Sequence, residues 1–274
     1  MIVVTCANTD VARGTKGNQK FQDRFRFSKV ISTTARNARR FGYGVEIYDL
    51  GELGMGTPFR VEDKHFAEMG HYKREPIGGY KSKALFKPAL MKECLTKNRQ
   101  ITAYLDGDAE LRRPIDGVIS DDYDVGVTLR DRSEMETEWY RDHKAIVKYL
   151  NAGVIFFNYT DATLGFIDRW EKLTDEVGND QMALNQLACP EHYPEPGAVH
   201  VIDNVRIKYF PCVKYNYYYF YELLPSRASI MHYKGDVRDN YPFTWHKYWF
   251  SMFYITVKRL ARKFLRRGQT PAIE

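Results

Sequence analysis

Two aspartates one residue apart, Asp106 and Asp108, have the types and spacing that metal chemistry requires. They follow residues 101–105, a mostly apolar run that predicts a buried strand. In extended backbone, residues two apart point to the same side, so both carboxylates can address one cation, and Gly107 leaves room for a phosphate. Mg²⁺ and Mn²⁺ prefer such oxygens and keep open positions for phosphate groups. Carboxylates at strand ends are also ordinary in solvated turns, so the pair alone leaves both interpretations open.

The elements that must position these aspartates alternate between strands and helices. Apolar runs predict strands, and apolar residues at helical spacing predict helices. The expected strands are 2–6, 45–50, 101–105, 124–129, 151–158 and 228–232, with short strands also within 199–210. The expected helices are 25–41, 80–95, 160–177 and a short one that opens at 179–181. This order predicts an α/β fold with a mostly parallel central sheet flanked by helices on both faces.

Length and composition place the chain among globular proteins. Its 274 residues and 44% hydrophobic content suit one large domain. The four cysteines are widely spaced and form no metal or redox motif, which predicts a reduced, cytoplasmic setting. The sequence has no run of about 20 apolar residues that could span a membrane.

The net charge of +6 comes from the C-terminal tail, residues 240–274. This tail holds seven Lys/Arg and one acid, whereas residues 1–239 contain 34 basic and 34 acidic residues. A balanced body argues against a nucleic-acid-binding surface. We therefore expect a single domain at 1–239, followed by the tail, and no nucleic-acid partner.

The tail has the pattern of a basic amphipathic helix. Its apolar face consists of Trp245, Trp249, Met252, Phe253, Val257, Leu260 and Phe264. Its opposite face carries Lys258, Arg259, Arg262 and Arg266. A helix of this kind lies in the plane of an anionic membrane, which predicts peripheral membrane association. The alternatives are a helix docked on the body and a nucleic-acid patch.

Two further features stay ambiguous. The aromatic run 215–221 is either a stacking wall for a sugar or base or a cluster that packs in the core. The helix expected at 80–95 carries Lys81, Lys83 and Lys87, and lysines on helices are usually solvated.

Four motifs occur in one order along the chain. They are Tyr104–Asp108, Asn151–Val154, Asn179–Gln181 followed by Leu184–Asn185, and His232–Arg238. In this order they resemble the motifs of the GT-A retaining glycosyltransferases, in the family that holds glycogenin and the bacterial lipopolysaccharide galactosyltransferases. The resemblance covers residues 1–239. It implies the GT-A fold, the Rossmann-like fold of nucleotide-diphospho-sugar transferases, and the C-terminal amphipathic helix predicted above from its own pattern follows this domain.

The resemblance also implies a role for each motif. Mn²⁺ or Mg²⁺ would be held by Asp106, Asp108 and His232, and would in turn hold the diphosphate of a UDP-sugar donor. Donor-binding residues would be Thr5, Ala7, Asn8, Lys83, Asp106, Gly235 and Arg238. Catalytic residues facing the donor sugar and the acceptor would be Asn151, Asp180 and Gln181. The implied reaction is transfer to a glycan or lipid-linked acceptor with retention of configuration. Because the family has no generally agreed nucleophile, we prefer attack on the front face of the sugar as its mechanism.

Departures from the family pattern leave alternatives open. Arg238 stands where the family has Lys, which keeps the charge but changes its geometry, and the Pro-Trp that follows in the family is absent. A sugar-phosphate nucleotidyltransferase on a related fold would need a Gly-rich basic signature after its first strand, which residues 14–17 imitate only faintly. A catalytically inactive nucleotide-sugar-binding module is the other alternative.

Overall fold

A computed structural model describes residues 1–7, 27–49, 60–61, 74–75, 86–136, 140–141, 148–218 and 227–233, with single positions at 244, 246, 249, 250, 253 and 257. Its elements in chain order are β1 (Ile2–Ala7), α2 (Phe27–Arg40), β2 (Gly44–Asp49), β3 (Arg60–Val61), β4 (Arg74–Glu75), α4 (Phe86–Asn98), β5 (Thr102–Asp106), β6 (Ala109–Leu111), η3 (Asp116–Val118), β7 (Val125–Leu129), α5 (Arg132–Met135), β8 (Leu150–Phe157), α7 (Asp161–Val177), α8 (Asp180–Ala188), β9 (Val199–Ile202), β10 (Val205–Phe210), α9 (Cys212–Tyr215) and β11 (Ile230–His232). The strands and helices expected from the sequence are found within a few residues of their predicted bounds. The helix expected at 80–95 is observed from Phe86, and residues 80–85 lie outside the described part of the chain.

The described residues form a central seven-stranded sheet in the order β2-β1-β5-β8-β7-β10-β9. Strands β1, β2, β5, β7 and β10 run in one direction, whereas β8 and β9 run the opposite way. The expected α/β fold is therefore confirmed, but the sheet is mixed, because β8 lies antiparallel between β5 and β7. All eight residues of β8 are buried, and such a continuous apolar run has the same pattern in either direction.

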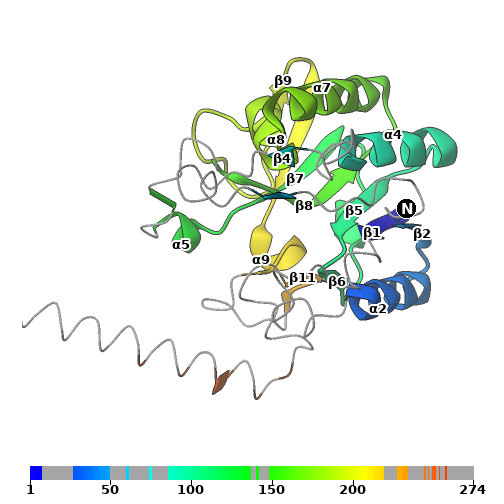
Figure 1. Cartoon of the computed structure of the whole chain (residues 1–274), viewed down its shortest axis with the longest axis vertical. Coiled ribbons are helices and arrows are strands. Elements are labelled where there is room, and N and C mark those ends of the chain that lie inside the picture. Colours follow the sequence, from blue (N-terminus) through cyan, green and yellow to red (C-terminus); the bar gives the residue numbers. More distant parts are fainter. Residues whose placement is uncertain are drawn as a thin grey trace, which may run out of the picture.

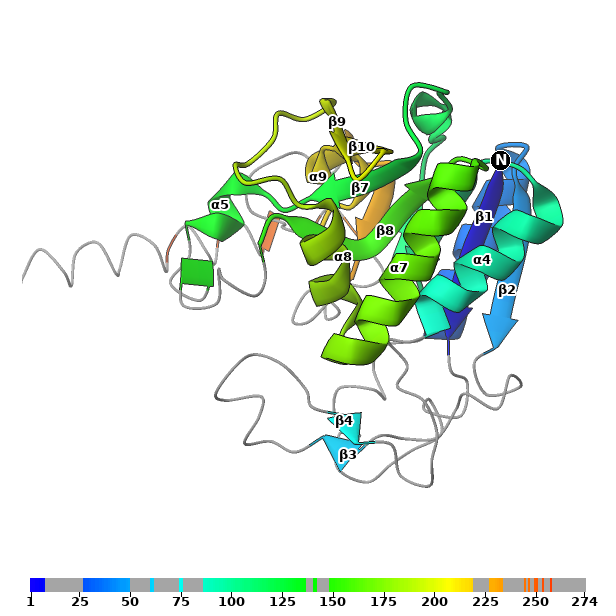
Figure 2. The same cartoon turned by 90° about the horizontal axis from the view of Figure 1, so that it is seen from above.

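Helices cover both faces of this sheet. Figure 1 shows α4, α7 and α8 on one side, and α2 with the small β6–β11 sheet on the other. Seen from above, α4 and α7 lie side by side over the strands (Figure 2). Alternation along β5 divides the core in two: Tyr104 packs on the α4 and α7 side, whereas Ala103 and Leu105 pack on the α2 side.

Local sequence chemistry sets the break between α7 and α8. Gly178 ends α7 in the left-handed conformation, with φ of 69°. Asn179 then caps α8, because its side chain accepts a hydrogen bond from the backbone N–H of Met182. Asp180 is thereby placed in the first turn of α8, at the end of the helix whose dipole favours a carboxylate.

The aromatic run 215–221 belongs to the core as far as the structure describes it. Tyr215, Tyr217 and Tyr218 are each at most 4% exposed. The Tyr215 ring meets Phe156 and Phe210 edge to face, at centroid distances of 5.8 and 5.2 Å. These three tyrosines therefore follow the core-packing interpretation, and residues 219–221 lie outside the described part.

The structure offers no membrane-spanning helix: within the part of the chain that it describes, none is both long and apolar enough. The described apolar residues of the tail are exposed, at 58% for Trp249, 72% for Phe250, 69% for Phe253 and 47% for Val257.

Candidate functional site

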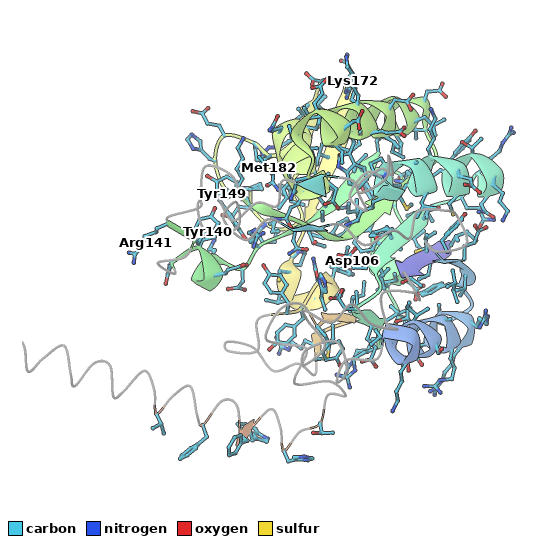
Figure 3. All side chains as sticks on the ribbon, viewed as in Figure 1. Asp106, Tyr140, Arg141, Tyr149, Lys172 and Met182 are labelled. Atoms are coloured by element: carbon cyan, nitrogen blue, oxygen red, sulfur yellow. The ribbon has the colours of Figure 1, made fainter. Side chains whose placement is uncertain are left out.

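The carboxyl end of β5 brings two aspartates and a histidine together. Asp106 is the last residue of β5 (Figure 3), and Asp108 follows in a turn. The antiparallel pairing of β6 with β11 sets His232 opposite Ala109, next to this turn. His232 Nε2 lies 3.1 Å from Asp108 Oδ1 and 3.8 Å from Asp106 Oδ2. We refer to Asp106, Asp108 and His232 as the metal-candidate cluster.

The route by which the aspartates converge differs from the expectation. The strand ends at Asp106, so Asp108 does not follow it in extended backbone. Instead, the residue after β11 holds the turn, because the backbone N–H of Tyr233 donates to the carbonyl of Asp108 at 2.9 Å. The two carboxylates share a site because of this tertiary contact and the turn, not because of the two-residue period of a strand.

The donor atoms of the metal-candidate cluster suit a divalent cation. One ligand atom from each residue lies within 4.8 Å of the others. Asp108 and His232 are buried, and the Asp106 side chain is 30% exposed, which leaves an opening on one side. Carboxylate oxygens suit Mg²⁺ and Mn²⁺, whereas an imidazole is a softer ligand that favours transition metals. The residues present therefore fit Mn²⁺ better than Mg²⁺.

Lys87 links the metal-candidate cluster to α8. Its ammonium lies 3.1 Å from Asp106 Oδ1 and 2.6 Å from Asp180 Oδ2, and its side chain is 11% exposed. It also donates a hydrogen bond to the carbonyl of Ala152 at 2.9 Å. Burial alone would lower the pKa of Lys87, but the charges of Asp106 and Asp180 outweigh burial and raise it. Lys87 therefore stays charged between the two carboxylates.

Asp106 has an unusual environment for a carboxylate. Burial raises its pKa, and the charge of Lys87, which favours the ionised form, does not fully offset burial. The Tyr104 hydroxyl donates to Asp106 Oδ1 at 2.9 Å. A carboxylate with a raised pKa in a polar cluster is a typical sign of a functional site.

Sequence reasoning placed the functional lysine of this helix at Lys83, which lies outside the described residues. Lys87, one turn later, was treated as a solvated lysine. A signal for its role was available, since Lys87 stands in the first turn of α4, where the helix dipole disfavours a cation and no acid accompanies it. A lysine at that position needs a carboxylate from elsewhere in the fold.

Two of the predicted catalytic residues, Asp180 and Asn151, are connected to this centre through other side chains. Asp180 is joined to Asp106 through Lys87, and the indole N–H of Trp170 donates to the Asp180 carbonyl at 2.9 Å. Gln181 follows in α8, and its backbone carbonyl accepts a hydrogen bond from the side-chain amide of Asn185 at 2.7 Å. Asn151 is 2% exposed in β8, and its Oδ1 accepts hydrogen bonds from the Gly153 N–H at 2.8 Å and from Asn216 at 3.0 Å.

Asn216 is a site residue that sequence reasoning missed, because it was grouped with the aromatic run. It is fully buried, and its Oδ1 lies 2.9 Å from His232 Nδ1. Gly153 allows this packing, since a Cβ on Gly153 would lie 2.2 Å from His232 Cε1. The sequence shows Asn216 next to Tyr215 and Tyr217, but it shows nothing of its contact with His232.

The remaining predicted donor residues are untested by the described structure. Thr5 is 1% exposed within β1, and Ala7 ends that strand. The other predicted donor residues, Asn8, Lys83, Gly235 and Arg238, lie outside the described part of the chain.

Comparison with known proteins supplies the family. The family model described as nucleotide-diphospho-sugar transferase matches residues 89–268. A search of curated proteins finds no match. The matched range contains the whole metal-candidate cluster and extends beyond residue 239 into the tail.

Solved structures with similar folds include three glycosyltransferases. A glycosyltransferase involved in the glycosylation of the major capsid of PBCV-1 is 11% identical, with 87% of this chain and 97% of that chain covered and a TM-score of 0.49. The galactosyltransferase LgtC, in complex with donor and acceptor sugar analogs, is 15% identical, with coverage of 86% and 88% and a TM-score of 0.46. The glycosyltransferase GlyE of Streptococcus pneumoniae TIGR4 is 13% identical, with 96% of this chain and 63% of that chain covered and a TM-score of 0.47. These scores are low, so the family assignment rests on the family model.

Proposed function

Since this chain belongs to the nucleotide-diphospho-sugar transferase family, we propose that it moves a sugar from a UDP-sugar to a glycan or glycolipid acceptor, with a divalent metal and with retention of configuration. Family membership makes it a glycosyltransferase. The metal, the nucleotide, the acceptor and the stereochemistry are the proposed parts. The observation that carries the metal dependence is the meeting of Asp106, Asp108 and His232 at the end of β5.

The metal-candidate cluster would hold Mn²⁺ through the Asp106 and Asp108 carboxylates and His232 Nε2. A bound Mn²⁺ supplies positive charge that offsets the negative charge developing on the departing nucleoside diphosphate. The partly exposed Asp106 carboxylate lies on the open side of the cluster, where a diphosphate can approach. By the family resemblance, Gly235 and Arg238 would contact the same diphosphate, while Thr5, Ala7 and Asn8 would line the nucleoside end.

Lys87 holds two of the proposed site residues together. Its ammonium keeps the Asp106 and Asp180 carboxylates together at 3.1 and 2.6 Å, so the first turn of α8 is held beside the metal-candidate cluster. Asp180 and Gln181 would thereby face the donor sugar while the cluster holds its diphosphate. This arrangement positions the anomeric carbon by contacts on both of its sides.

Retention through attack on the front face agrees with the state of Asp180. A covalent intermediate would need a free carboxylate as nucleophile. The Asp180 carboxylate is paired with the Lys87 ammonium at 2.6 Å, which lowers its nucleophilicity. We therefore assign Asp180 a positioning and electrostatic role. The acceptor oxygen would bond to the anomeric carbon on the face from which the diphosphate departs, as the bond from that carbon to the diphosphate breaks and the departing diphosphate takes the hydroxyl proton.

Calorimetry of UDP, GDP and ADP binding, with Mn²⁺ and with EDTA, tests the metal and nucleotide together. We expect UDP to bind at least tenfold tighter with Mn²⁺ than without it, and the other two to bind more weakly. Equal UDP affinity in both conditions would contradict the metal-dependent proposal. A panel of UDP-sugars should then show metal-dependent release of UDP, whereas tight binding without any turnover would favour the inactive module.

Two product measurements test the chemistry. Proton NMR of the anomeric signal should show an α-linked product from an α-linked donor. A β-linked product would show inversion of configuration and contradict the proposed retention. The nucleotidyltransferase alternative predicts pyrophosphate release from a nucleoside triphosphate and a sugar phosphate. We expect no such release.

We also propose that the tail meets an anionic membrane surface. The exposed side chains of Trp249, Phe250 and Phe253 supply an apolar face, and the Lys/Arg residues of the tail supply charge. Serine at these three aromatic positions should reduce flotation with anionic vesicles while activity on a soluble acceptor mimic is kept. Unchanged flotation would contradict the proposal. Flotation of the wild type should also weaken with salt, because charges are screened over about 10 Å at 0.1 M ionic strength.

A further inference from the structure

We propose that Asn216 is a positioning residue that fixes the metal-binding tautomer of His232, through a buried relay that begins at the backbone N–H of Gly153. The relay runs from Gly153 through Asn151 and Asn216 to His232. The inference rests on the proposed metal dependence of the transferase. It assigns Asn151 to the relay that orients His232.

The relay starts at an irregularity in β8. Val127 pairs with Ile155, but the next residue of β7, Thr128, pairs with Asn151. Residues 152–154 are therefore extra on β8, and the N–H of Gly153 turns back to the Asn151 side chain at 2.8 Å. A backbone N–H can only donate, so the Asn151 atom that it meets must be the oxygen.

The orientation of the Asn216 amide follows from this oxygen. Asn151 Oδ1 is an acceptor, so the Asn216 atom 3.0 Å from it must be the NH₂ group. The same NH₂ group donates to Thr128 Oγ1 at 2.7 Å. The Thr128 hydroxyl can accept there because its own hydrogen is directed to the carbonyls of Asn151 and Val154, each at 3.1 Å. The Asn216 oxygen is left facing His232.

The tautomer of His232 follows in turn. Asn216 Oδ1 lies 2.9 Å from His232 Nδ1, so Nδ1 must carry a hydrogen and donate it. In the neutral ring Nε2 then holds a lone pair. That lone pair faces Asp108 Oδ1 at 3.1 Å and Asp106 Oδ2 at 3.8 Å. The two carboxylate oxygens and Nε2 are all electron-pair donors, and a cation between them would bind all three.

Burial makes the relay a firm constraint. Asn216 is 0% exposed, Asn151 2% and His232 4%, so bulk water cannot replace a missing partner. The space is also closed, because a Cβ on Gly153 would lie 2.2 Å from His232 Cε1 and 2.6 Å from Nδ1. The ring therefore packs tightly against Gly153 of β8, and the contact of its Nδ1 with Asn216 sets its orientation.

The experiment reads the tautomer and the metal affinity separately. Long-range proton–nitrogen NMR on protein labelled with ¹⁵N-histidine, without metal, identifies which ring nitrogen keeps its proton, and a His232→Gln sample assigns the signal among the seven histidines. We expect Nδ1 of His232 to stay protonated whether the ring is neutral or charged. Asn216→Ala should release the Nδ1 proton and weaken Mn²⁺ binding by about 10–100-fold, as loss of an outer partner of a ligating histidine does.

Two further variants separate positioning from packing. Asn216→Asp keeps an oxygen opposite Nδ1, so the Nδ1 proton should be retained. Asn185→Ala is the matched control, because Asn185 is also a buried asparagine, 1% exposed, that anchors β8 through the backbone of Leu150. It should lower stability without changing Mn²⁺ affinity or the tautomer.

An Nε2-protonated neutral ring in the wild type, or equal losses of Mn²⁺ affinity in Asn216→Ala and Asn185→Ala, would overturn the role of Asn216. Failure of the proposed function has a different outcome. In that case the wild type keeps the Nδ1 proton, but UDP affinity does not respond to Mn²⁺.

Discussion

Asp106 and Asp124 occupy opposite ends of the central sheet, and their surroundings shift their pKa values in opposite directions. Asp106 ends β5, whereas Asp124 precedes β7, which runs in the same direction. Asp124 Oδ1 accepts from Arg206 at 2.9 Å and from the Thr160 hydroxyl at 3.0 Å, and Oδ2 accepts from the Arg206 backbone and Nε at 2.9 and 3.1 Å. Burial raises the pKa of Asp124, but the Arg206 hydrogen bonds outweigh burial and lower it. The pKa of Asp106 is raised.

This difference separates a carboxylate in a structural ion pair from one that we propose holds a metal. Every oxygen of Asp124 meets donors from its own chain, so the site has no remaining demand for positive charge. Among the described residues, Asp106 lies beside Asp108 and His232, and Lys87 pairs it with Asp180. The grouping of two carboxylates with an imidazole at this end supports the proposed cation site.

The largest expected effect is the loss of metal binding in Asp108→Ala. Removing one of three ligands should weaken Mn²⁺ binding at least 1000-fold, about 4 kcal/mol, and remove the metal dependence of UDP binding. Calorimetry measures both. Asp168→Ala is the matched control, because Asp168 is 53% exposed in a surface ion pair, and its Mn²⁺ affinity should equal that of the wild type. Intact Mn²⁺ binding in Asp108→Ala would show that the two ends of the sheet do not differ as described.

Lys87→Met tests the charge balance at the Asp106 end. The methionine keeps the apolar stem but leaves Asp106 and Asp180 without their shared cation, so stability should fall by about 3 kcal/mol. Urea unfolding with and without Mn²⁺ checks this, and Mn²⁺ should recover part of the loss. Lys97→Met removes an exposed partner of Glu46 and should leave the unfolding midpoint nearly unchanged. Similar unfolding midpoints in the two variants would mean that pairing with Asp106 and Asp180 gives Lys87 no larger effect on stability than an exposed lysine has.

Asp124→Asn tests the end of the sheet where both carboxylate oxygens accept hydrogen bonds. Losing the charge opposite Arg206 should cost about 2 kcal/mol at pH 7 without any change in Mn²⁺ affinity. The folded pKa of Asp124 is lowered, so its contribution is present above about pH 4 and is lost as pH falls through the folded pKa. The stability gap between wild type and variant should therefore close in acid. A gap that stays constant down to pH 2 would contradict this origin of the stabilisation.

The smallest effect is expected for Lys92→Ala. Lys92 pairs with Asp168 at 2.5 Å, but both side chains are about half exposed, at 46% and 53%. Water and salt screen such a pair, so the melting temperature should change by less than about 1 °C. A shift as large as that of Asp124→Asn would show that burial does not decide which ion pairs matter in this protein.

Much of the fold was predictable from the sequence because its signals are local. The apolar runs of β1, β5, β7 and β8 and the helical spacing of α2 and α7 appear in consecutive residues. The break at Gly178 and Asn179 is also local, since a left-handed glycine and a capping asparagine act on their own neighbours. The Asp106–Asp108 pair and the order of the motifs identified the cluster and its family.

Only the tertiary structure decided how these parts meet. The direction of β8, the turn that brings Asp108 to His232, the pairing of Lys87 with Asp180 and the contact of Asn216 with His232 all join segments that are distant in the chain. Periodicity records which face of an element is apolar, but not which polar side chain will lie opposite it. For that reason the sequence by itself predicted the elements and the residue types of the metal-candidate cluster, and the packing of β8, α4, α8 and β11 determined which lysine and which asparagine contact that cluster.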